Sequence, residues 1–186
     1  MSTPYPVAIL VGSLRKASFS RKMALAAAKL APSSLKPAVV EIGDLALYDE
    51  DGEAETPAGW TTFRNKMKAA EAVLFVTPEY NRSVPGVLKN AIDVGSRPYG
   101  QSVFNGKPGA VISVSPGAIG GFGANHHLRQ SLVFLNVPTM QQPEAYIGGA
   151  GSLFDEAGEI TNPGTRDFIA KFMAAFAAWV ETNAKG

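Results

Sequence analysis

The segment that follows the first apolar run of the chain carries four side chains that can donate hydrogen bonds to a phosphate: Ser13, Arg15, Ser18 and Ser20. Three hydroxyls and a guanidinium at the start of a helix suit a terminal phosphate monoester, because the free N–H groups and dipole of a helix N-terminus also attract anions. The segment has neither the spaced glycines of a dinucleotide fingerprint nor the Gly-Lys-Ser/Thr of a P-loop. We therefore predict a phosphate site here. The alternative is that Ser18 or Ser20 only caps the helix and that Arg15 is solvated.

A second candidate segment begins with Pro78, Glu79, Tyr80 and Asn81. Tyr80 offers a flat apolar face, and the Asn81 amide beside it can both donate and accept hydrogen bonds. A planar heteroaromatic ligand needs both features. The alternative is an ordinary surface turn with an exposed tyrosine. For Glu79 we favour a structural role, paired with Arg82 or with a neighbouring chain, over acid–base catalysis.

A third candidate segment, residues 115–123, is rich in glycine and includes Ser115 and Gly117. Glycines let a backbone approach a flat ring closely, and the N–H groups can then point at the carbonyl edge of the ring. The alternative is a flexible connection between two elements of secondary structure.

Alternating apolar runs and amphipathic segments predict the elements that position these three segments. Strands that are apolar on both faces, separated by helices, indicate an α/β fold with a doubly wound parallel sheet covered by helices on both sides. Ligands of such folds bind at the carboxyl ends of the strands, where all three candidate segments begin. The expected strands are residues 6–11, 38–42, 72–77 and 109–114, with 137–141 as an edge or irregular fifth strand because of Pro138. The expected helices are 19–30, 60–70, 85–94, one through Leu128, Leu132 and Leu135, and 168–180.

Composition narrows the possible functions. The hydrophobic fraction of 46% and the charged fraction of 18% are typical of a globular protein, and we expect one domain over residues 1–186. A net charge of +1 gives no indication of a nucleic-acid or membrane-surface partner. The chain has no cysteine and its start lacks the pattern of a signal peptide, so we expect a cytoplasmic protein. Neighbouring side chains of a helix, such as His126 and His127, point about 100° apart, so we expect no metal site.

Taken together, the three segments resemble the NADPH-dependent FMN reductase family, and within it the quinone and chromate reductase group. The resemblance rests on Gly12-Ser13-Leu14-Arg15 with Ser18 and Ser20, on Pro78-Glu79-Tyr80-Asn81, and on Ser115-Pro116-Gly117. It implies a flavodoxin-like five-stranded sheet in the order 2-1-3-4-5. It also implies bound FMN, with the phosphate on Ser13, Arg15, Ser18 and Ser20, the ring and ribityl chain against Pro78, Glu79, Tyr80 and Asn81, and the pyrimidine edge at Ser115 and Gly117.

The resemblance further implies an activity in which NADPH or NADH reduces the flavin and the flavin then reduces a quinone, another flavin, an azo dye or a metal oxyanion such as chromate. This would be a ping-pong reaction that needs no catalytic side chain, because the chemistry belongs to the cofactor. Members form homodimers or homotetramers, and we expect Arg82 at a subunit interface. One alternative is a flavodoxin-type one-electron carrier, which the net charge of +1 disfavours because such carriers are acidic. A second is a binding protein without redox activity.

Overall fold

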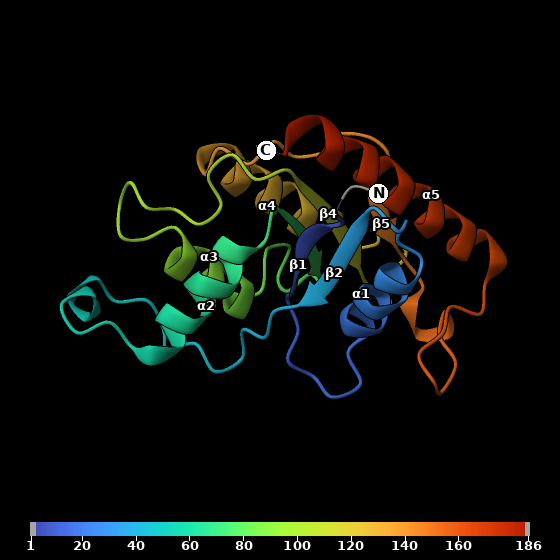
Figure 1. Cartoon of the computed structure of the whole chain (residues 1–186). Coiled ribbons are helices and arrows are strands. Elements are labelled where there is room, and N and C mark those ends of the chain that lie inside the picture. The colour runs from blue at the N-terminus through green and yellow to red at the C-terminus, as the bar shows by residue number, and fades with distance from the viewer. Residues whose placement is uncertain (1–2, 185–186) are drawn as a thin grey trace.

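The computed structural model describes residues 3–184 and contains one five-stranded parallel sheet (Figure 1). The strand order is β2-β1-β3-β4-β5, and every neighbouring pair is parallel, as predicted. The strands are β1 (Tyr5–Val11), β2 (Leu35–Val39), β3 (Ala72–Thr77), β4 (Gly109–Val114) and β5 (Ala145–Ile147).

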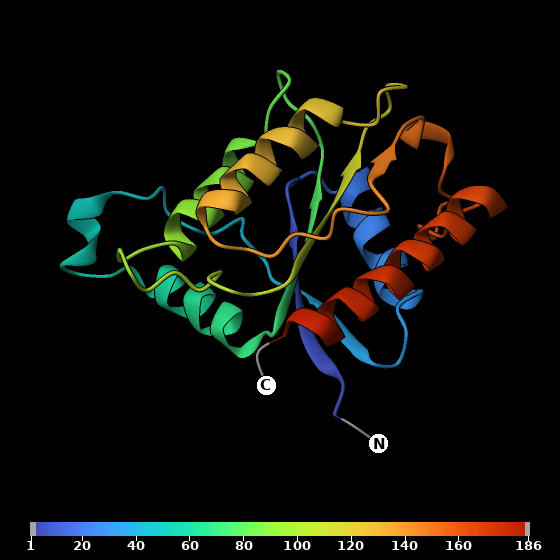
Figure 2. The same ribbon diagram turned by 90° about the horizontal axis from the view of Figure 1, so that it is seen from above.

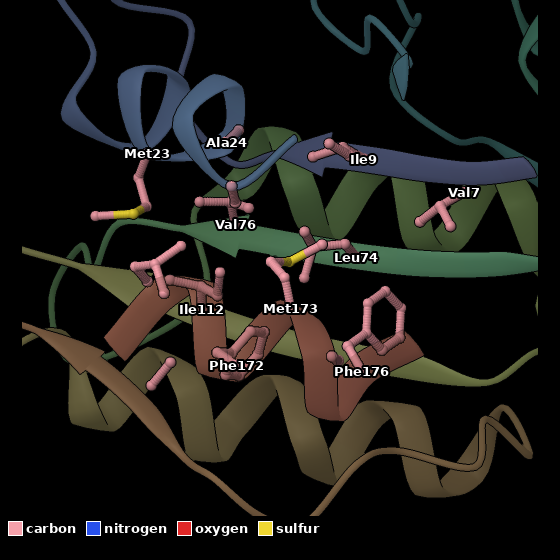
Figure 3. Close-up of a cluster of buried hydrophobic side chains, with 14 of the residues drawn as sticks. Val7, Ile9, Met23, Ala24, Leu74, Val76, Ile112, Phe172, Met173 and Phe176 are labelled. Carbon is pink, nitrogen blue, oxygen red and sulfur yellow. The ribbon is translucent and has the colours of Figure 1, made fainter. Parts of the chain in front are cut away.

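Helices cover both faces of the sheet, as Figure 2 shows. Every residue of β3 and β4 is buried, which explains why these strands are apolar except for Thr77 and Ser113. Phe172, Met173 and Phe176 of α5 point at Leu74 and other strand residues in one of the two hydrophobic cores (Figure 3). One face of the sheet is covered by α1 (Phe19–Lys29) and α5 (Pro163–Asn183), and the other by α2 (Ala58–Ala69), α3 (Gly86–Gly95) and α4 (Phe122–Phe134). Two short 3₁₀ helices are η1 (Glu50–Glu53) and η2 (Ala150–Ser152).

The predicted bounds of the second strand were wrong. The strand occupies Leu35–Val39 rather than 38–42, and Tyr5 of β1 lies opposite Leu35. Val40 still donates its N–H to the Ile9 carbonyl at 2.9 Å, after which the chain leaves the sheet. Val40 and Ile42 are buried because they pack into the core on the α2 side, so their apolar character reports burial in a loop and not strand pairing.

The fifth strand was also misplaced, at 137–141 instead of Ala145–Ile147. The backbone of the predicted segment forms hydrogen bonds with the first residue of β4. The Pro138 carbonyl accepts the Gly109 N–H at 3.0 Å, and Met140 donates its N–H to the Gly109 carbonyl at 2.8 Å. The observed strand pairs with Ile112–Val114, the second half of β4. Three residues are too few to show a period in the sequence.

Side-chain caps define where two helices begin. Ser18 caps α1 by accepting the Arg21 N–H at 3.1 Å, which confirms one of the two predicted caps. Asn162 caps α5 by accepting the Thr165 N–H at 2.8 Å, and Pro163 follows it in the first turn.

Replacing Asn162 with alanine should lower the free energy of unfolding by about 1 kcal/mol, because the Thr165 N–H loses its acceptor. For a chain of this size that corresponds to roughly 2–4 °C in Tm, which thermal unfolding followed by circular dichroism can measure. Asn162→Asp keeps an oxygen acceptor and is the control. A Tm for N162A equal to that of the wild type would contradict the prediction.

Candidate active site

The loops that follow β1, β3 and β4 enclose a cavity of about 310 Å³ at the carboxyl edge of the sheet. All the predicted site residues line it except Asn81 and Gly117, which are exposed nearby on the same loops. The structure therefore brings together three segments that are far apart in the sequence. The lining residues are Ser13, Arg15, Ser18, Phe19, Ser20, Pro78, Glu79, Tyr80, Val114, Ser115 and Pro116; Phe19, Val114 and Pro116 were not predicted, although each adjoins a residue that was.

One end of the cavity has the donors of a phosphate site. The side chains of Ser18 and Ser20 are buried at the N-terminus of α1, and Ser13 is buried on the preceding loop. Because the Ser18 oxygen accepts the Arg21 N–H, its own O–H remains able to donate. The first N–H groups of a helix have no acceptor within the helix, so the N-terminus of α1 adds backbone donors to these hydroxyls.

Arg15 has no acidic partner among residues 3–184, and it lines the cavity. Its guanidinium lies 5.3 Å from the centre of the Phe19 ring and donates to the Ala17 carbonyl at 3.2 Å. Arg21, in contrast, forms an ion pair with Glu41 at 2.6 Å, which raises the pKa of Arg21 and lowers that of Glu41 through the hydrogen bonds between them. Of the two cations on this loop that have no acidic partner in the described part of the chain, Arg15 and Lys16, only Arg15 lines the cavity and is therefore placed to meet a ligand.

Tyr80 stands at the start of a tight turn on the loop after β3. The N–H groups and carbonyls of Tyr80 and Ser83 pair with each other at 3.1 and 3.0 Å, and the two residues between them, Asn81 and Arg82, both have positive φ. This is the backbone of a type I′ turn, in which asparagine is favoured. The turn leaves the Tyr80 side chain half exposed on the cavity wall, as a flat apolar surface.

Glu79 contacts two other residues through its carboxylate, and its role in the site stays a prediction. One carboxylate oxygen accepts the Ala124 N–H at 3.0 Å in the first turn of α4, and the other lies 3.6 Å from the Arg82 guanidinium. The predicted pairing with Arg82 is therefore present. The contact with α4 could not be found in the sequence, because Ala124 is distant along the chain and its side chain takes no part.

The loop after β4 is tied to β5. Ser115 donates its N–H to the Ile147 carbonyl at 2.9 Å, and the Gly117 N–H is donated to the Ser115 hydroxyl at 3.1 Å. Pro116 has no N–H. The N–H groups of Ser115 and Gly117 therefore have acceptors within the chain, and the expected contact of segment 115–123 with a ring stays a prediction.

The two adjacent histidines of α4 contact different elements. His126 Nε2 lies 3.0 Å from the Tyr146 hydroxyl, and His127 Nδ1 lies 3.0 Å from the Ser83 hydroxyl. Burial, together with Glu144, raises the pKa of Tyr146 to about 12. Within residues 3–184, no group of three or more His, Asp or Glu side chains has an arrangement that could hold a metal ion, and no helix is long and apolar enough to span a membrane.

Comparison with known proteins identifies the family. The sequence model of the NADPH-dependent FMN reductases matches residues 5–152. The chain belongs to this family. A quinone reductase of Pseudomonas putida is 65% identical over 184 residues, which cover 98% of each protein. A 2-hydroxy-1,4-benzoquinone reductase of a Burkholderia species is 48% identical, over 94% of this chain and 95% of that protein.

The structure of this FMN reductase family member closely matches that of a solved flavoenzyme. FerB of Paracoccus denitrificans, an NAD(P)H:acceptor oxidoreductase, superposes with a TM-score of 0.92 at 40% identity, covering 97% of this chain and 100% of FerB. These findings confirm the predicted family, the flavodoxin-like fold, and an oxidoreductase that uses FMN with NAD(P)H. The role of each cavity residue stays a prediction.

Proposed function

We propose that this family member reduces quinones with electrons from NAD(P)H by a ping-pong mechanism, and that chromate and other metal oxyanions are further acceptors. The observation that carries the proposal is the cavity that joins a phosphate-binding helix N-terminus to an apolar wall. The high identity to a quinone reductase over nearly the whole chain supports quinones as acceptors.

The residues present fit FMN. Its phosphate needs several donors and a cation, which Ser13, Ser18, Ser20, Arg15 and the N-terminus of α1 can supply. Its ring needs flat apolar contacts, and these line the rest of the cavity. When bound, FMN accepts a hydride from a nicotinamide and passes electrons to an acceptor.

The chain's own residues bind and orient in this proposal. Pro78 and Tyr80 line the cavity from the loop after β3, and Ser115 and Pro116 line it from the loop after β4. The carboxylate of Glu79 is held by Ala124 and Arg82, so it is not free to act as a base. Nicotinamide and acceptor would occupy the same opening in turn, and an opening with few specific contacts would admit acceptors of different shape.

Anaerobic absorbance spectroscopy tests this function. The purified protein should be yellow, lose its flavin absorbance on addition of NADPH, and recover it on addition of a quinone after the nicotinamide has been removed. Two separable half-reactions are the signature of ping-pong kinetics, and chromate in place of the quinone tests the wider acceptor range. Bound flavin that neither NADPH nor NADH bleaches would favour the one-electron carrier; a protein that takes up no FMN would contradict the proposal.

We also propose that the protein forms a homodimer or homotetramer. Four large apolar side chains near the cavity are exposed: Leu14, Tyr80 and Ile119 on the three loops, and Phe122 at the start of α4. A partner copy would bury this surface. Sedimentation velocity at micromolar concentration should show a dimer or tetramer, and a monomer would contradict the proposal.

A further inference from the structure

Helix α4 has no cap of its own. Gly121 is in the N-cap position with φ of 76°, and it has no side chain to accept from the first turn. A helix end without a cap leaves backbone N–H groups unsatisfied. The missing acceptor comes from another loop, because the Glu79 carboxylate accepts the Ala124 N–H at 3.0 Å.

The contact between Glu79 and α4 is closely packed on both sides. A Cβ atom on Gly123 would lie 2.9 Å from the Glu79 carboxylate oxygen and 2.8 Å from the Arg82 carbonyl oxygen. Only a glycine therefore allows the loop after β3 to approach the first turn of α4 this closely. The Glu79 side chain is mostly buried, and its charge lies at the positive end of the α4 dipole and near Arg82.

These contacts join the two loops that line opposite parts of the cavity. Glu79 lies between Pro78 and Tyr80, and α4 begins directly after the loop that carries Ser115 and Pro116. The hydrogen bond between Glu79 and Ala124 therefore links two segments that line the same cavity.

We propose that the Glu79 side chain is a positioning residue that sets the width of the flavin site by capping α4 across the two loops. Its carboxylate acts through the backbone of α4 and not on the reacting atoms. The inference rests on the proposed function, since it assumes that FMN occupies the cavity. A cap that served stability alone would leave FMN affinity unchanged.

Three substitutions separate these roles. Glu79→Ala removes the cap, and Glu79→Gln keeps an oxygen acceptor for Ala124. Gly123→Ala leaves residue 79 a glutamate but pushes the loop after β3 away from the first turn of α4. The matched control is Asn162→Ala, which removes a cap of the same kind from α5, whose residues do not line the cavity. FMN dissociation is measured by flavin fluorescence on dilution of the loaded protein, and Tm is measured beside it.

We expect E79A and G123A each to raise the dissociation constant for FMN about tenfold, the loss of roughly one hydrogen bond. E79Q should stay within about threefold of the wild type, and N162A should lower Tm without changing the FMN constant. The inference is overturned if E79A changes the dissociation constant for FMN no more than N162A does. If E79A does not fold, the inference is overturned when G123A binds FMN like the wild type. Failure of the wild-type protein to bind FMN would instead overturn the proposed function.

Discussion

Replacing Arg15 with alanine should raise the dissociation constant for FMN by about 10- to 100-fold and leave that for riboflavin almost unchanged. A hydrogen bond to a charged group contributes about 1.5–3 kcal/mol, and riboflavin lacks the phosphate that would receive it. Arg15 is exposed and has no acidic partner among residues 3–184, so its loss leaves no buried charge behind. Fluorescence titration of the two flavins measures both constants.

Lys16→Ala is the control for Arg15, because it removes an exposed cation from the next position of the same loop. We expect it to change FMN binding less than threefold, because Lys16 does not line the cavity and salt screens an exposed charge that makes no direct contact. Equal loss of FMN and riboflavin affinity in R15A would contradict the phosphate assignment. That result would place the Arg15 guanidinium near the flavin ring. In the structure the guanidinium lies 5.3 Å from the centre of the Phe19 ring.

Gly120→Ala should destabilise the protein by about 3 kcal/mol, or roughly 6–12 °C in Tm. Gly120 has φ of 64°, a conformation that costs an alanine about 1–2 kcal/mol. Its Cβ would also lie 2.6 Å from the Tyr146 carbonyl carbon and 2.9 Å from the Ile147 nitrogen, and overpacking adds about 1–3 kcal/mol. Denaturant unfolding of the variant measures the sum.

Gly149→Ala separates the two contributions. Gly149 has nearly the same φ, 62°, but no atom lies within 4 Å of an added Cβ. We expect this variant to lose only the conformational part, about 1–2 kcal/mol. Equal effects at the two glycines would show that the contact with β5 is relieved by a shift of the loop.

Glu79 shows which contacts of the site are readable from local sequence and which are not. Its pairing with Arg82 was predictable because the two residues share one turn, and the structure confirms it at 3.6 Å. Its hydrogen bond with Ala124 was not predictable, because the donor is a backbone N–H and does not depend on the residue type. The hydrogen bond from the Gly117 N–H to the Ser115 hydroxyl was not predictable for the same reason.

The sequence by itself determined the central strands, their order and the place of the site. Residues 72–77 and 109–114 are apolar except for Thr77 and Ser113, because helices cover both faces of the sheet, and polar residues follow each strand where parallel strands end. Arg15 and the serines were recognisable because their chemistry is carried by side chains close together in the chain.

The tertiary structure alone decided the edges of the sheet and the link between the loops. Val40 and Ile42 are as apolar as strand residues but are buried by packing outside the sheet, and β5 is too short for a period to reveal it. The ion pair that Arg21 forms with Glu41 is likewise visible only in space. Periodicity and residue type report local burial and chemistry. Strand pairing, the close approach of the loop after β3 to Gly123, and the capping of α4 by Glu79 depend instead on atoms that are distant in sequence.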